Sequence, residues 1–182
     1  MTEPMEVAQV LKIVLIGDGT VGKTAIRKKF IDKTFTPNYL MTIGSDFAIY
    51  EMNIENVGQI ILQIWDLAGQ PHFTVVRNLY YQGCKGALLV YDVSNPITFQ
   101  NVPGWLAELE KNVQNVPICL IGNKIDLRGQ VNSAITTEEG VKLAEELRQE
   151  GRDIFAVETS AVTGEGIKKA FSELAKLLVR NL

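Results

Sequence analysis

Near-continuous apolar runs recur along the chain and predict buried strands. They cover residues 10–16, 86–92, 116–122 and 154–160. Because a strand is apolar on both faces only when both faces are covered, these runs are typical of a parallel sheet between helices. Residues 45–54 and 59–66 form two more strand-like runs with only four residues between them, which predicts an antiparallel hairpin.

Helical periodicity lies between the strands. One apolar stripe consists of Val102, Leu106, Leu109 and Val113. Thr136 followed by Glu139 fits a capping box that opens a helix through residue 147, and residues 167–178 carry an apolar face on the last helix. Strand followed by helix, repeated, predicts a three-layer α/β domain whose ligands bind beyond the carboxyl ends of the strands.

Composition and charge narrow the class of protein. The 182 residues predict a single domain, residues 1–182, in which residues 1–9 are a short N-terminal extension. The net charge of −3 argues against nucleic acid as a partner, and the absence of a long apolar run or a signal peptide indicates a cytoplasmic protein. Cys84 and Cys119 are expected to be reduced core thiols, and a single histidine, His72, argues against a His/Cys metal site.

A glycine-rich phosphate-binding motif follows the first predicted strand. Its residues are Gly17, Asp18, Gly19, Thr20, Val21, Gly22, Lys23 and Thr24, and they match G-x-x-x-x-G-K-[ST]. The glycines let the backbone approach phosphate oxygens, and the following helix N-terminus adds positive potential. We expect Lys23 to reach the outer phosphates and the Thr24 hydroxyl to bind Mg²⁺. This motif predicts a nucleoside triphosphate without naming the base.

A second motif, Asn123-Lys124-Ile125-Asp126, predicts guanine. The Asp126 carboxylate can accept hydrogen bonds from the guanine ring N–H and its exocyclic amine, whereas adenine would leave it unpaired. Asn123 could contact the purine edge, and the stem of Lys124 could pack on the ring. Ser160 and Ala161, at the end of the last strand, would bring a backbone N–H to the guanine oxygen.

The segment from Trp65 to Gln70 ends the second hairpin strand and supplies candidate metal and catalytic residues. Asp66 could hold Mg²⁺ through water, Gly69 could donate its N–H to the γ-phosphate, and Gln70 could orient the attacking water. The alternatives are a strand-end cap for Asp66 and a solvated loop residue for Gln70.

Taken in order and spacing, these motifs resemble those of the Ras superfamily over about residues 10–180, within its Rab-like branch. The resemblance also includes Thr42-Ile43-Gly44 and Glu158-Thr159-Ser160-Ala161, while the phosphate loop itself is more Rho-like. It implies a six-stranded, mostly parallel sheet with one antiparallel strand and about five helices. It also implies two switch loops, residues 35–43 and 68–81, that relax when the γ-phosphate is lost.

The resemblance assigns further roles. Phe35 would pack against the guanine, Tyr39 would close over the phosphates, and Thr42 would bind both Mg²⁺ and the γ-phosphate. Catalysis is assigned to Gln70, Lys23, Thr42 and Gly69, and the metal to Thr24, Thr42 and Asp66. The residues expected to bind GTP or GDP are Gly17, Asp18, Gly19, Thr20, Val21, Gly22, Lys23, Thr24, Ala25, Phe35, Tyr39, Thr42, Gly69, Asn123, Lys124, Asp126, Ser160, Ala161 and Val162.

The implied function is a monomeric GTP-binding switch that slowly hydrolyses GTP, with an effector, an exchange factor and a GTPase-activating protein as partners of the switch loops. Gly19 lies where a side chain would obstruct a partner's arginine. Pro71, where the family usually has glutamate, could stiffen the catalytic loop. Val162 replaces a usual lysine, and residues 179–182 contain no cysteine, so either a lipidated tail was removed or the protein is not lipidated, and no membrane attachment is expected. The alternatives are a nucleotide-locked scaffold with negligible turnover and an ATP-using P-loop enzyme.

Overall fold

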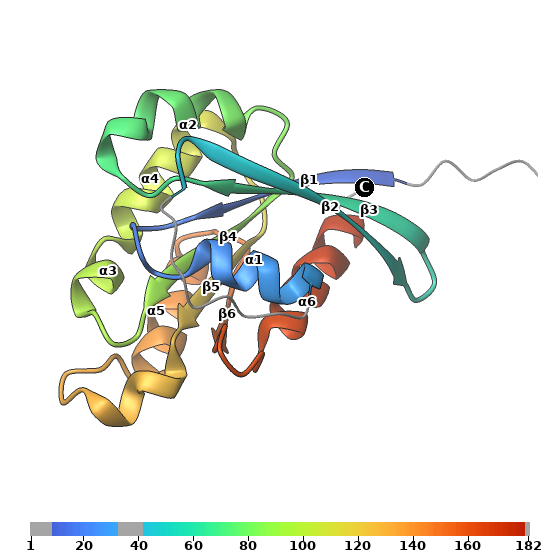
Figure 1. The fold of residues 1–182 in the computed structure, drawn as a ribbon. Helices are drawn as coiled ribbons and strands as arrows, with labels where there is room; N and C mark the ends of the chain where they lie inside the picture. Colours follow the sequence, from blue (N-terminus) through green and yellow to red (C-terminus); the bar gives the residue numbers. More distant parts are fainter. Residues whose placement is uncertain (1–8, 33–41, 181–182) are drawn as a thin grey trace, which may run out of the picture.

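A single six-stranded sheet runs through the molecule in the computed structural model, which describes residues 9–32 and 42–180 (Figure 1). Its strands are β1 (Gln9–Ile16), β2 (Ser45–Ile54), β3 (Gly58–Leu67), β4 (Gly86–Asp92), β5 (Ile118–Asn123) and β6 (Ile154–Thr159). The strand order is β2-β3-β1-β4-β5-β6, and only β2 pairs antiparallel to its neighbour. The predicted hairpin and the mostly parallel sheet are therefore confirmed.

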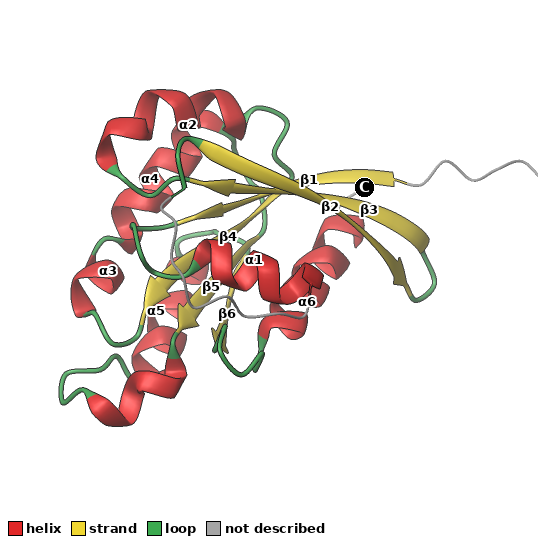
Figure 2. Ribbon diagram, in the orientation of Figure 1, coloured by secondary structure: helices red, strands yellow, loops and turns green. Residues whose placement is uncertain are grey.

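The described residues form six α-helices, shown in red in Figure 2. They are α1 (Lys23–Asp32), α2 (Thr74–Tyr81), α3 (Pro96–Gln100), α4 (Val102–Asn112), α5 (Thr137–Gln149) and α6 (Ile167–Arg180), with short 3₁₀ helices at Pro71–Phe73 and Ile125–Gln130. About five helices were expected; the short α3, which is separated from α4 only by Asn101, makes the difference. The capping box between Thr136 and Glu139 is present at the start of α5.

Helices cover both faces of the sheet, so two apolar cores form. Helices α1 and α6 bury one face, where the rings of Phe30 and Phe171 stack with centroids 3.8 Å apart. Helices α2, α4 and α5 contribute to the core on the other face. Both cysteines are buried and free, as predicted. Among the helices of the described residues, none is both long and apolar enough to cross a membrane.

The predicted start of β5 was wrong by two residues, and the apolar stripe of α4 extends one residue past the end of the helix. The strand begins at Ile118 rather than Val116, because Pro117 lacks an N–H for the ladder. Helix α4 ends at Asn112, and Val113 already has extended backbone angles (φ −140°, ψ 140°), although its N–H still bonds to the carbonyl of Leu109. The apolar stripe continued by one residue beyond the helix because Val113 packs on the core from an extended conformation.

The carboxyl ends of the strands form two level groups, β1 with β3 and β4 with β5 and β6, and this positions the candidate site. Leu15 of β1 is in register with Asp66 of β3, and Asp92, Asn123 and Thr159 are in register at the ends of β4, β5 and β6. The chain crosses to opposite sides of β1 to form β3 and β4, which places the β1–α1 loop at the point where α/β sheets bind ligands.

Candidate functional site

The turn formed by residues 17–22 joins β1 to α1, and two other segments pack against it. Gly22 has a φ of 102°, and a Cβ on it would lie 2.3 Å from Nδ2 of Asn123. A Cβ on Gly69 would lie 2.4 Å from the carbonyl carbon of Asp18. Only glycine permits these close approaches, so the loop, the end of β3 and the end of β5 form one continuous surface.

Lys23, the first residue of α1, is buried beneath this loop. Its Nζ donates hydrogen bonds to the carbonyl oxygens of Gly17 at 2.6 Å and Asp18 at 2.7 Å. Burial lowers the pKa of Lys23 to about 8, and the nearby carboxylates of Asp66 and Asp18 oppose that shift. The ammonium is thus held against the loop whose N–H groups are suited to bind phosphate.

The side chain of Asp18 is fixed by the α3–α4 region, a contact that sequence reasoning missed. Its carboxylate accepts hydrogen bonds from Nε1 of Trp105 at 2.7 Å and from Nδ2 of Asn101 at 2.7 Å. The ring of Trp105 belongs to the apolar core on this face of the sheet. A buried indole N–H needs an acceptor, which was the available signal, but the sequence did not indicate which acceptor.

Three oxygen-bearing side chains meet at the junction of α1, β3 and the segment before β2. The Thr24 hydroxyl donates to Oδ2 of Asp66 and lies 2.9 Å from Oγ1 of Thr42. Asp66 is fully buried, and its Oδ1 has no hydrogen-bond partner among the described residues. Burial raises the pKa of Asp66, while the Thr24 hydrogen bond and the charges of Lys23 and Arg27 lower it. One carboxylate with an unpaired oxygen and two hydroxyls form a donor set that suits Mg²⁺.

Gln70 follows directly after this junction, and its conformation is set by the next residue. Gln70 has extended backbone angles (φ −75°, ψ 142°), which is the conformation that a following proline favours. Pro71 occupies the first position of a 3₁₀ helix, where its missing N–H costs nothing. The side-chain Oε1 of Gln70 is buried without a partner among the described residues, so it is available to a polar ligand or water.

Arg77 on α2 holds the backbone of this segment, a role that sequence reasoning missed. Its guanidinium donates to the carbonyl oxygens of Ala68 and Gln70, both at 2.9 Å. It also forms two hydrogen bonds with the carboxylate of Glu108 on α4, at 2.6 and 2.8 Å, and lies 4.6 Å from the ring centroid of Trp105. Because Trp105 also binds Asp18, the loop, the Gln70 segment and α4 are joined through one polar network.

The predicted base-reading residues lie together after β5 and β6. Asp126 is exposed, and one of its carboxylate oxygens accepts a hydrogen bond of 2.5 Å from the Ser160 hydroxyl. Lys124 has a left-handed backbone (φ 67°), and its Nζ lies 2.6 Å from Oδ2 of Asp92. The backbone N–H of Ser160 donates to the carbonyl of Glu165. Within the Ser160-Ala161 pair, the N–H of Ala161 is therefore the candidate hydrogen-bond donor to a purine oxygen.

Asn123 links the two halves of the candidate site. Its Nδ2 donates to the carbonyl of Val21 at 2.8 Å, and its Oδ1 accepts from the Thr159 hydroxyl at 2.9 Å. Besides its expected contact with a purine edge, Asn123 therefore connects the phosphate loop to β6 by internal hydrogen bonds. These bonds explain why the residue is almost completely buried. Ala25 lies in the first turn of α1, and Val162 is exposed. The predicted roles of Phe35 and Tyr39 lie outside the described residues.

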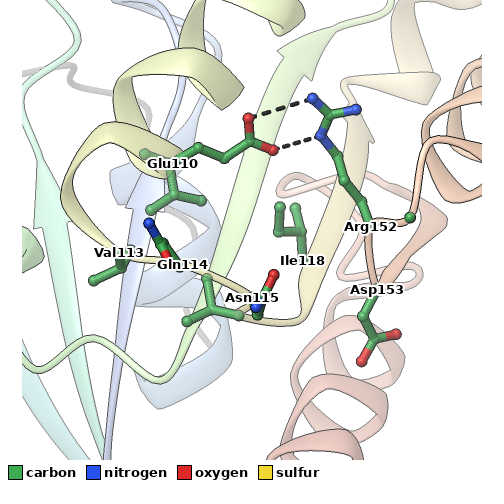
Figure 3. A pocket seen from close by; sticks show the side chains of 10 residues that line it. Glu110, Val113, Gln114, Asn115, Ile118, Arg152 and Asp153 are labelled. Carbon is green, nitrogen blue, oxygen red and sulfur yellow. Dashed lines mark hydrogen bonds and ion pairs between the residues drawn. The ribbon is translucent and has the colours of Figure 1, made fainter.

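A separate hollow of about 400 Å³ lies at the other end of the sheet, near the start of β5 (Figure 3). Its wall includes Val113, Gln114 and the ion pair between Glu110 and Arg152. None of the predicted site residues lines it. The catalytic and binding candidates gather at the carboxyl edge instead.

Comparison with known proteins agrees with this geometry. The model of the Ras family matches residues 12–180. Ras-related protein YPT3 of Nicotiana plumbaginifolia is 42% identical over 93% of this chain and 74% of its own length. Ras-related protein Rab-18 of Lymnaea stagnalis is 36% identical over 98% of this chain and 85% of its own length. Ras-related protein SEC4 of Saccharomyces cerevisiae is 36% identical over 93% of this chain and 75% of its own length.

The fold and the motifs define a P-loop small GTPase, a class of proteins that bind guanine nucleotide. The chain belongs to the Ras family and is similar to its Rab-named members.

Proposed function

We propose that this chain is a Mg²⁺-dependent GTP-binding switch that hydrolyses GTP slowly. The observation that carries the proposal is that three parts of the site meet at the carboxyl ends of the strands. These parts are the phosphate loop with Lys23, the oxygen set around Asp66, and the Asp126–Ser160 pair. Each part fits a different portion of the ligand: the phosphates, the metal and the base.

In this proposal the chain mainly positions and neutralises charge. Lys23 and the loop N–H groups bind the outer phosphates, and Thr24, Thr42 and Asp66 hold Mg²⁺, which neutralises charge on the phosphate oxygens when bound. Gln70 orients the water, and Asp126 selects guanine. Turnover is slow because no arginine of the chain is assigned to the transferring phosphate, and a partner's arginine would add on the order of 10³–10⁵-fold.

The switch would act through Thr42 and Gly69, whose contacts to the γ-phosphate are lost on hydrolysis. The large apolar side chains of Ile43, Phe47, Val75 and Leu79 are exposed, and they lie in or close to the two proposed switch segments along the chain. The ring of Phe47 stacks on Trp65 with centroids 5.1 Å apart, and Trp65 in turn contacts Tyr80 at 5.2 Å. We propose that effectors and regulators bind these exposed apolar side chains, since exposed apolar surface on a folded domain often marks an interaction site.

The first test is to denature freshly purified protein and identify the released nucleotide by chromatography. GDP is expected. GTP alone would favour the nucleotide-locked scaffold, and an adenine nucleotide would contradict the role of Asp126 and favour the ATP-using enzyme.

Hydrolysis is tested in the same protein with Gln70→Leu. Affinity for GTP should persist, and the single-turnover rate should fall by about 10-fold or more, because the water loses its orienting group. Gln82→Leu makes the same change at an exposed glutamine after α2 and should leave the rate unchanged. An undiminished rate in Gln70→Leu would contradict the assigned role.

A further inference from the structure

A buried arginine, Arg27, lies beside the proposed metal site and has no part in the function described so far. It is in the second turn of α1, and its side chain is only 9% exposed. Its Nε lies 4.0 Å from Oδ2 of Asp66 and has no hydrogen-bond partner among the described residues. Buried charges are normally paired, so the position of this cation requires an explanation.

The guanidinium lies between two carboxylates that differ in exposure. Its Nη2 forms an ion pair with Oδ2 of Asp46 at the start of β2, where the Asp46 side chain is 57% exposed. Asp66, on the other side, is fully buried and carries the unpaired Oδ1. Water screens the charge of Asp46 far more than that of Asp66, so Asp46 only partly neutralises Arg27.

We propose that Arg27 is a positioning residue that shares the charge of Asp66 with Mg²⁺ and thereby weakens metal binding in the nucleotide-bound protein. This inference rests on the proposed function. When the metal leaves, Arg27 still compensates the buried carboxylate, so the loss of Mg²⁺ leaves less uncompensated negative charge beside the phosphates. Nucleotide retention should therefore depend less steeply on Mg²⁺ than it would without the arginine.

The test measures release of GDP carrying a fluorescent N-methylanthraniloyl group across a series of free Mg²⁺ concentrations. Arg27→Gln should lower the Mg²⁺ concentration for half-maximal retention by about 10-fold, because a repelling charge near the ion is removed. It should also speed release in the presence of chelator. Arg27→Lys keeps the charge and should stay close to wild type, and Arg152→Gln, at the opposite end of the sheet, should change nothing.

Asp46→Asn distinguishes a charge effect from structural damage. It leaves Arg27 in place without its exposed partner, so the Mg²⁺ requirement should rise, by about threefold, in the direction opposite to Arg27→Gln. Thermal denaturation shows which variants are folded, and Asp46→Asn still tests the charge effect if Arg27→Gln does not fold.

Three results would contradict the inference. The first is that Arg27→Gln needs the same Mg²⁺ concentration for half-maximal retention as Arg152→Gln. The second is that Arg27→Gln raises this concentration, as Asp46→Asn is expected to do. The third is that Asp46→Asn leaves this concentration unchanged. A wild-type chain that bound no guanine nucleotide would instead overturn the proposed function, and the inference with it.

Discussion

Glycines of the phosphate loop differ sharply in what their positions require. Gly22 has a positive φ and touches Asn123, whereas a Cβ on Gly19 would meet nothing within 4 Å. The motif separates these two positions, because Gly22 matches its second fixed glycine and Gly19 falls at a position where any residue is allowed. The backbone angle and the neighbouring Asn123 give the physical reason why glycine is required at residue 22.

Exchanging each glycine for alanine tests this difference. Gly22→Ala should lower the free energy of unfolding by about 2–3 kcal/mol, since alanine is strained at φ 102° and displaces the Asn123 amide. Gly19→Ala should remain within about 1 kcal/mol of wild type. Chemical denaturation of both variants measures the effect, and equal losses would contradict the structural distinction.

At the scale of elements, helix α2 depends on a contact with α4. Arg77 bonds to the backbone of the Gln70 segment while Glu108 holds its guanidinium, and the Tyr81 hydroxyl donates to the same carboxylate at 2.8 Å. Burial raises the pKa of Glu108, but the hydrogen bonds from Arg77 and Tyr81 lower it by more, so the net pKa lies below its ordinary value of 4.5. The ionised pair therefore stabilises the fold above that value, and this contribution is lost as the pH falls through the lowered pKa.

Glu108→Gln is expected to reduce the free energy of unfolding at neutral pH by about 1–3 kcal/mol, because the Arg77 charge is left buried and poorly paired. The variant should also lose stability less steeply than wild type on acidification. Denaturation at a series of pH values measures both effects. Glu110→Gln, on the same helix but paired with the more exposed Arg152, should cost less than about 1 kcal/mol. A wild-type acid response in Glu108→Gln would contradict the assignment.

The sequence predicted elements well where one local rule decides them. The apolar run at residues 86–92 has the same bounds as β4, and the capping box at Thr136 correctly predicted where α5 begins. Ligand-binding motifs were readable because each lies directly after a strand. The contacts of Arg77 with Glu108 and of Trp105 with Asp18 were not readable, because they join residues 31 and 87 positions apart. Neither residue type nor periodicity indicates which distant partner a buried polar group will find.

At the scale of the whole molecule, the two ends of the sheet differ in chemistry. The carboxyl edge gathers the loop, the oxygen set and Asp126, while the opposite edge has the hollow beside Glu110 and Arg152. The strands β4 and β5 between them are buried along their length, and none of the predicted site residues lines the hollow, so we expect binding at one end to leave the other unchanged.

Hydrogen exchange with and without GDP and Mg²⁺ would test this separation. Protection should increase in residues 17–24, 66–70, 123–126 and 160–162, where the ligand satisfies backbone groups or orders side chains that bind it. Residues 113–118 and 151–153, around the hollow, should exchange at the same rate in both conditions, and ADP should protect neither set. Increased protection around the hollow would mean that nucleotide binding changes the far end of the sheet, or that nucleotide also binds at the hollow. A site confined to the carboxyl ends of the strands would then be incomplete.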